Sequence, residues 1–112
     1  YLINADWLDC ISNKAFNIIV SNPPYIAPSD PHLEELTHEP SSALIAYENG
    51  LKDIKLISNQ ASKILVNDGL LVFEHGFDQA DSVEKILTES GLIKIKLLKD
   101  YQFHPRITIA KK

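Results

Sequence analysis

The sequence predicts an α/β domain with a mostly parallel sheet that ends in an antiparallel hairpin. Two short apolar runs have the composition of buried strands, and segments with apolar residues at helical spacing follow each of them along the chain. Two more strand-like runs close the sequence with a short connection between them. The order strand, helix, strand, helix, strand, strand is typical of an α/β fold.

The first half of the chain holds one buried strand and one long irregular stretch. Residues 1–6 are expected to form the end of a strand. Phe16–Ser21 is a β-branched apolar run that stops at Asn22–Pro24, where two prolines cannot donate ladder hydrogen bonds. The irregular stretch runs from Tyr25 to about Asn49, with a short helix expected over His32–Thr37. A loop of this length in a compact domain usually carries function.

The second half alternates helices and strands. Apolar residues recur at helical spacing from Leu51 to Leu65, and Asn67–Gly69 is expected to end this helix in a turn. The remaining predicted elements are a buried strand over 70–74, a helix marked by Ala80, Val83, Ile86 and Leu87 that ends at Ser90-Gly91, and strands over 93–98 and 106–110. The last two strands form the expected hairpin, which Asp100 and Arg106 are expected to bridge.

Composition indicates one compact domain. The chain has 112 residues, of which 45% are hydrophobic, enough for a single core. The net charge is −4 and no basic tract stands out, so a large nucleic-acid surface is not indicated. No apolar run has the length of a membrane span, and residues 1–6 lack the pattern of a signal peptide. The single cysteine, Cys10, fits a reducing compartment, so we expect a cytoplasmic protein.

The sequence gives no reason to expect a metal site. Its histidines show no ligand spacing with Cys10 or with one another; they are His32, His38, His75 and His104. Glu74 and His75 would suit acid–base chemistry, but we interpret them as hydrogen-bonding groups at the end of a strand. The chain contains no methionine, and we expect it to be cut from a longer protein.

The residues that carry chemistry follow the first buried strand directly, as Asn22-Pro23-Pro24-Tyr25. In open α/β sheets, ligands bind at this carboxyl edge. An amide or conjugated amine has a delocalised, poorly nucleophilic lone pair, and two hydrogen-bond acceptors aimed at its N–H groups would favour charge on nitrogen. The Asn22 side-chain oxygen and the Pro23 carbonyl are the candidate acceptors, and the Tyr25 ring offers a face for a planar group. Positioning then supplies most of the rate. The alternative is that these residues only terminate the strand.

The segment Ser21–Ile26 resembles the signature of Rossmann-like amino-methyltransferases. Other segments narrow the resemblance to the protein-(glutamine-N5) methyltransferases that modify the Gly-Gly-Gln motif of bacterial peptide chain release factors. They are His38-Glu39-Pro40, Ser42-Ala43-Leu44, Asn49-Gly50-Leu51, Glu74-His75-Gly76, Gln79, Lys99-Asp100-Tyr101 and Arg106-Ile107-Thr108. The resemblance implies a partial Rossmann-like class I methyltransferase fold, with residues 1–112 as the C-terminal part of one catalytic domain. It also implies S-adenosylmethionine as cofactor and a release factor as partner.

The resemblance implies a role for each residue of the motif. Asn22 and Pro23 would be catalytic, with Asn22 contacting both the target amide and the methionine end of the cofactor. Pro23 and Pro24 would shape the amide site, and Tyr25 would pack on the target.

The resemblance also implies cofactor contacts outside the motif. Asp6 and Trp7 would lie beside the adenine, with Trp7 as an aromatic wall. From the residues alone, a single tryptophan after a strand is more often part of the core, and Asp6 equally suits local capping.

Two features of the family are missing, namely its glycine-rich loop and the acidic residue that binds the ribose. The four glycines form no Gly-x-Gly pattern, and the helical domain that recognises the release factor is absent too. We therefore expect the isolated chain to bind cofactor poorly, to lack turnover and to expose an apolar sheet edge that favours self-association.

Two alternatives stay open at this point. An adenine-N6 methyltransferase acting on nucleic acid would use the same four residues, because the adenine amino group is also planar and conjugated, although the net charge of −4 argues against it. The other alternative is a non-catalytic fragment that needs its N-terminal part. With the leading interpretation, we expect a protein partner and neither a membrane nor direct nucleic-acid binding.

Overall fold

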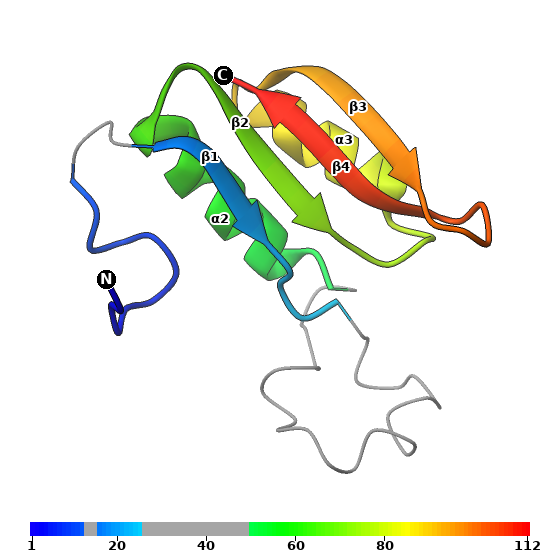
Figure 1. The fold of residues 1–112 in the computed structure, drawn as a ribbon, viewed down its shortest axis with the longest axis horizontal. Helices are drawn as coiled ribbons and strands as arrows, with labels where there is room; N and C mark the ends of the chain where they lie inside the picture. The colour runs from blue at the N-terminus through cyan, green and yellow to red at the C-terminus, as the bar shows by residue number, and fades with distance from the viewer. Residues whose placement is uncertain (13–15, 26–49) are drawn as a thin grey trace, which may run out of the picture.

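The computed structural model describes residues 1–12, 16–25 and 50–112 (Figure 1). Their elements are, in order, β1 (Phe16–Ser21), α2 (Lys52–Ile64), β2 (Leu65–Glu74), α3 (Ala80–Glu89), β3 (Ile93–Lys99) and β4 (Pro105–Lys111). The strands form one sheet, and both helices lie against the same face of it (Figure 1). The expected irregular stretch from Tyr25 to Asn49, with its helix over His32–Thr37, lies outside the described residues apart from Tyr25 itself.

The sheet has the strand order β1-β2-β4-β3. β1 and β2 pair in parallel, whereas β4 pairs antiparallel with both β2 and β3. The predicted C-terminal hairpin is therefore confirmed, but the sheet is mixed and not mostly parallel in its pairings. The reason is that β4 turns back between β2 and β3, so two antiparallel pairings replace the single parallel pairing that β2 and β3 would make.

The core lies between the sheet and the two helices. Residues at helical spacing on α2 and α3 are fully buried against alternate residues of β2; they are Ile54, Ile57, Ala61, Val83, Leu87, Leu71 and Phe73. Burial of the valine, leucine, isoleucine and phenylalanine side chains among them stabilises the fold by about 1.5–3 kcal/mol each. The two predicted helices are confirmed, because this apolar spacing is the same feature that packs them.

The start of the chain differs from the prediction. Residues 1–6 form no strand, and most of their side chains are exposed. A strand needs a neighbour for its backbone hydrogen bonds, and these residues lie outside the sheet (Figure 1). The chain contacts the rest of the fold at residues 8–11. The Leu8 N–H donates to Gln60 Oε1 at 3.0 Å, and the side chains of Leu8 and Ile11 pack on the core.

The turn predicted at Asn67–Gly69 is an irregularity inside β2. The strand begins at Leu65, and the register with β1 shifts so that Phe16 pairs with Leu65 but Ile18 pairs with Leu70. Asp68 has a φ of 67°, and its carboxylate lies 2.6 Å from Lys111 Nζ on β4. The Asp68 N–H donates to the Lys112 carbonyl at 3.1 Å and the Lys112 N–H donates to the Gly69 carbonyl at 2.9 Å, so this segment stays in the sheet where the sequence predicted a turn at the end of the helix.

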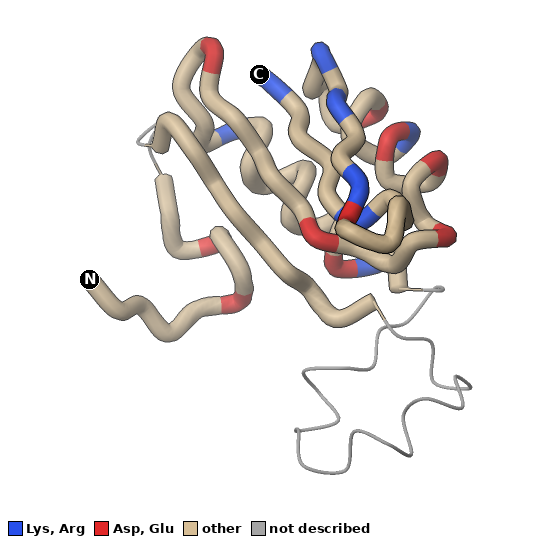
Figure 2. The backbone as a smooth tube through the Cα atoms, turned by 45° about the vertical axis from the view of Figure 1, so that its right-hand side comes forward, with Lys and Arg blue, Asp and Glu red and all other residues tan. Residues whose placement is uncertain are grey.

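The two edges of the described sheet differ in character. β3 carries lysines along its length, visible as blue segments in Figure 2, and such charges discourage pairing with another strand. β1 carries no charge, and Ile18 and Val20 on its uncovered face are 57% and 72% exposed. An apolar edge is therefore present as expected, while self-association through it remains a prediction. No helix among the described residues is long and apolar enough to cross a membrane.

Candidate functional site at the carboxyl edge of the sheet

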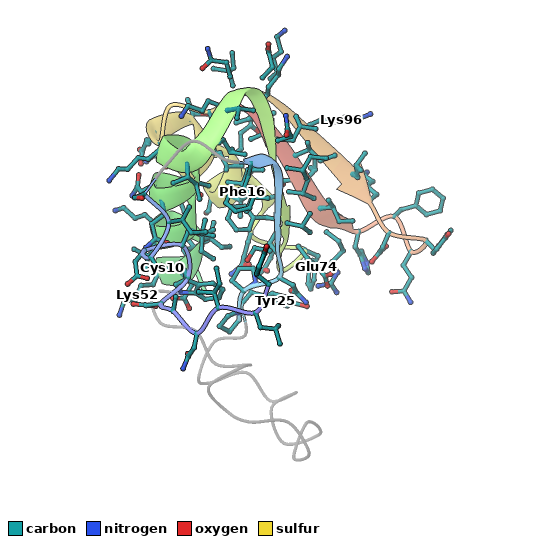
Figure 3. All side chains as sticks on the ribbon, turned by 60° about the vertical axis from the view of Figure 1, so that its left-hand side comes forward. Cys10, Phe16, Tyr25, Lys52, Glu74 and Lys96 are labelled. Atoms are coloured by element: carbon teal, nitrogen blue, oxygen red, sulfur yellow. The ribbon has the colours of Figure 1, made fainter. Side chains whose placement is uncertain are left out.

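The Asn-Pro-Pro-Tyr motif lies at one edge of the sheet together with the end of β2 and the β3–β4 turn. Because β1 and β2 run in parallel and Ser21 pairs with Phe73, the residues after both strands emerge side by side. β3 ends and β4 begins at this same edge, where Lys99 pairs with Pro105. Figure 3 shows Tyr25 close to Glu74. The edge therefore gathers side chains from four strands.

The four motif residues differ in exposure. The Pro23 side chain is fully buried, whereas Asn22 is exposed and Pro24 and Tyr25 are partly buried. Pro23 thus anchors the segment, and the two prolines restrict its backbone direction. Asn22 is exposed at the edge of the sheet, and its side-chain amide has both a carbonyl acceptor and an NH₂ donor.

Tyr25 is oriented by a carboxylate from the neighbouring strand. Burial raises the pKa of the Tyr25 phenol. The charge of Glu74 and a hydrogen bond with its carboxylate raise this pKa further, whereas the charge of Arg106 lowers it. The phenol therefore stays protonated and donates to Glu74. This contact places the Tyr25 hydroxyl beside Glu74. Sequence reasoning grouped Glu74 with His75 and missed this contact.

The backbone of Tyr25 is held by a second group of residues. The Gln79 side chain is buried, and its Nε2 donates to the Tyr25 carbonyl at 3.4 Å while its Oε1 accepts from the Gly76 N–H at 2.9 Å. Gly50 packs against both groups, since a Cβ at this position would lie 2.4 Å from Gln79 Nε2 and 2.5 Å from the Tyr25 carbonyl oxygen. We call Gln79 and Gly50 the Tyr25 clamp. Sequence reasoning quoted both residues only as part of a resemblance and gave them no role.

His75 has a structural role beside this clamp. Its side chain is fully buried, with Nδ1 2.8 Å from the Gly76 carbonyl and Nε2 2.8 Å from Thr108 Oγ1. A carbonyl only accepts, so Nδ1 carries the hydrogen and the neutral ring accepts at Nε2 from the Thr108 hydroxyl. Burial lowers the pKa of His75. The expectation of a hydrogen-bonding group at the strand end is confirmed, although its partners are Gly76 and Thr108 and not Glu74.

The buried His75 predicts a pH dependence of stability. Its pKa in the folded state lies below the ordinary value of 6.5, so in acid the unfolded state binds a proton that the folded state does not. The contribution is fully present above about pH 6.5 and is lost as the pH falls from there through the lowered folded-state pKa. We expect the free energy of unfolding, measured with urea, to decrease more in the wild type than in a His75→Gln variant when the pH is lowered from 8 to 5. Parallel curves for the two proteins would contradict this.

Asp100 and Arg106 bridge the hairpin as predicted. Arg106 Nε lies 3.6 Å from Asp100 Oδ2, and the Arg106 guanidinium lies 5.5 Å from the centroid of the Phe77 ring. Among residues 1–12, 16–25 and 50–112, no group of three or more histidine, cysteine or acidic side chains is arranged to hold a metal ion. Of the histidines weighed in the sequence, His32 and His38 lie outside these ranges.

Asp6 and Trp7, expected beside the cofactor, lie in the N-terminal segment before β1. Trp7 has a φ of 55° and is 36% exposed, so it is not a core residue. Asp6 is exposed, and its backbone carbonyl accepts from the Asp9 N–H at 3.3 Å in a turn. An exposed indole is available to a planar ligand, which agrees with the expected role without testing it.

The fold and the motif define the class, an α/β protein with the signature of an amino-methyltransferase. Over the part that it spans, the chain is similar to proteins named release factor glutamine methyltransferases. The Vibrio cholerae member is 48% identical over 98 residues, which cover 86% of this chain and 34% of that protein. The Salmonella typhimurium and Escherichia coli members are 38% and 34% identical over 98% and 99% of this chain.

The chain spans 34% to 41% of the length of these curated relatives. No protein-family model matches it. A solved structure of a Bordetella parapertussis protein, described as a possible exported protein, matches 96% of this chain and 42% of its own with a TM-score of 0.62. Sequence identity there is 12%, so this likeness concerns the fold alone.

Proposed function

We propose that a protein carrying this chain at the full length of its relatives methylates the side-chain amide nitrogen of the Gly-Gly-Gln glutamine in peptide chain release factors. Residues 1–112 would form the C-terminal part of a single Rossmann-like catalytic domain, and the reaction would take place in the cytoplasm. The observation that carries the proposal is Asn22, exposed at the carboxyl edge beside the buried Pro23, in a chain whose relatives are named for this activity.

The residues of this chain would act mainly by positioning. The Asn22 side-chain oxygen and the Pro23 carbonyl would accept the two N–H groups of the glutamine amide and so favour charge on its nitrogen. The Tyr25 ring, held by Glu74 and by the Tyr25 clamp, would pack on the amide plane. The nitrogen would gain the methyl group as the donor's sulfur–methyl bond breaks and the sulfur leaves as a neutral thioether. The nitrogen would then release a proton to water, so no buried base is required.

S-adenosylmethionine would supply the electrophilic methyl group when bound. The residues present fit one side of such a molecule: Trp7 offers an exposed aromatic face, and Asn22 and Asp6 offer exposed polar groups. The chain contains no Gly-x-Gly loop to cradle the amino acid end. We therefore propose that Asp6, Trp7 and Asn22 make part of the cofactor site and that the isolated chain binds cofactor weakly and does not turn over.

Replacing Trp7 with alanine should weaken cofactor binding without unfolding the protein. In the full-length context of the relatives, we expect the Kd for S-adenosylhomocysteine, measured by calorimetric titration, to rise about fivefold, because a stacked aromatic contributes roughly 1 kcal/mol. Phe16→Ala is the matched control. Phe16 is a similarly exposed aromatic residue, but it lies at the start of β1, opposite the end that leads to Asn22. An unchanged Kd with a lower melting temperature would instead assign Trp7 to packing.

The proposed activity is tested with a donor labelled in its methyl group. The full-length protein is incubated with a release factor, with the same factor carrying Gln→Asn in its Gly-Gly-Gln motif, and with adenine-containing nucleic acid. We expect label only in the unmodified factor, on the glutamine. Label in the nucleic acid would instead support the adenine-N6 alternative. Label in the Gln→Asn factor would show that the reaction does not select this glutamine.

A further inference from the structure

The β3–β4 turn presents aromatic side chains to solvent. Tyr101 is fully exposed and Phe103 is 79% exposed, while Phe77, in the loop after β2, is 54% exposed. Large aromatic side chains seldom gather on a surface without a partner, and aromatic residues with arginine are enriched where proteins bind proteins. We call Phe77, Tyr101 and Phe103 the hairpin patch.

The turn that carries two of these residues is tightly built. Asp100 Oδ1 accepts from the N–H groups of Gln102 at 2.8 Å and of His104 at 2.9 Å, and the Asp100 N–H donates to the His104 carbonyl at 2.9 Å. The Phe103 N–H also donates to the Asp100 carbonyl, at 3.0 Å. Phe103 has a φ of 65°, a conformation that is unfavourable for a bulky residue. The turn is therefore preorganised and keeps an exposed phenyl group at a strained position.

Arg106 connects the hairpin patch to the candidate site. Its guanidinium lies over the Phe77 ring and pairs with Asp100, and its charge also acts on the Tyr25 phenol. The Phe77 and His104 rings lie 5.3 Å apart. The patch thus sits at the same edge of the sheet as Tyr25, displaced across β2 and β4. At about 4.8 Å per strand, this displacement is about 10–15 Å.

From this arrangement we infer that the hairpin patch binds the surface of the protein substrate beside the residue that enters the Asn22–Tyr25 site. This inference rests on the proposed function. A glutamine side chain bound at Asn22 cannot reach the patch, but the polypeptide surface around it can. We favour a protein over a nucleic acid because Arg106 is already paired with Asp100, the net charge is −4, and the relatives are named for acting on a protein.

The test compares the full-length wild type with a Tyr101→Ala/Phe103→Ala double variant. We expect the Kd for an intact release factor, measured by calorimetry, and its KM to rise at least tenfold, because exposed aromatic anchors carry much of the energy of such interfaces. We expect kcat at saturating release factor, and the KM for a short Gly-Gly-Gln peptide, to stay the same. Ile93→Ala is the matched control, since Ile93 is an exposed apolar residue at the far end of β3.

The outcomes distinguish a failure of the docking role from a failure of the proposed function. An unchanged Kd and KM for the release factor in the double variant would overturn the docking role, and so would an equal rise in the KM for the short peptide. If the wild type binds the release factor but transfers no methyl group, the proposed function fails while a raised Kd in the variant still supports docking. A wild type that binds no release factor overturns both. Tyr101→Ser alone, at a fully exposed side chain, repeats the test should the double variant fold poorly.

Discussion

Asn22→Ala is expected to lower kcat by 100-fold or more in the full-length protein, with little change in melting temperature. The substitution removes an acceptor aimed at the reacting nitrogen, where charge develops only in the transition state, and loss of one such group typically costs about 2.7–4 kcal/mol. The Asn22 side chain is exposed, so the fold does not depend on it. The measurement is methyl transfer to a release factor at saturating substrate and cofactor.

Asn67→Ala provides the control for Asn22→Ala. Asn67 is also an exposed asparagine, but it lies in the irregular start of β2, at the opposite end of the strand from Glu74. It should leave kcat unchanged. Turnover within a few-fold of the wild type in Asn22→Ala would remove Asn22 from the chemistry and leave the motif as a strand terminator.

The sequence predicted those features that depend on neighbours along the chain. The apolar spacing of α2 and α3 and the run of β1 are local patterns, and the structure packs these same residues into the core. The Asn-Pro-Pro-Tyr motif was identified for the same reason. Its exposure pattern, with Pro23 buried and Asn22 accessible, fits the role expected of it.

Features set by contacts between distant segments were not predictable. The place of β4 between β2 and β3 depends on which edge the hairpin folds onto, and no local pattern encodes that choice. The Tyr25 clamp joins Gln79 to a carbonyl 54 positions earlier in the sequence. Residues 1–6 have strand-like composition, yet they form no strand, because a strand requires a neighbour with which to pair.

Gly50→Ala is expected to destabilise the protein by about 2–5 kcal/mol, as measured by urea unfolding. Two effects combine at this buried position. Its φ of 80° is unfavourable for any residue with a Cβ, by about 1–2 kcal/mol, and the added methyl group would overlap the Gln79 side chain and the Tyr25 carbonyl. Overpacking of this kind adds about 1–3 kcal/mol.

Gly91→Ala separates the two effects, because Gly91 has nearly the same φ, 82°, but no atom lies within 4 Å of its added Cβ. It should cost only the backbone term, about 1–2 kcal/mol. The excess at Gly50 then measures how firmly the Tyr25 clamp is packed. In the full-length protein, Gly50→Ala should also reduce methyl transfer while Gly91→Ala does not, because only the first displaces Tyr25. Equal losses of stability in the two variants would mean that the clamp yields to the methyl group, and Tyr25 would not be held rigidly enough to position a substrate.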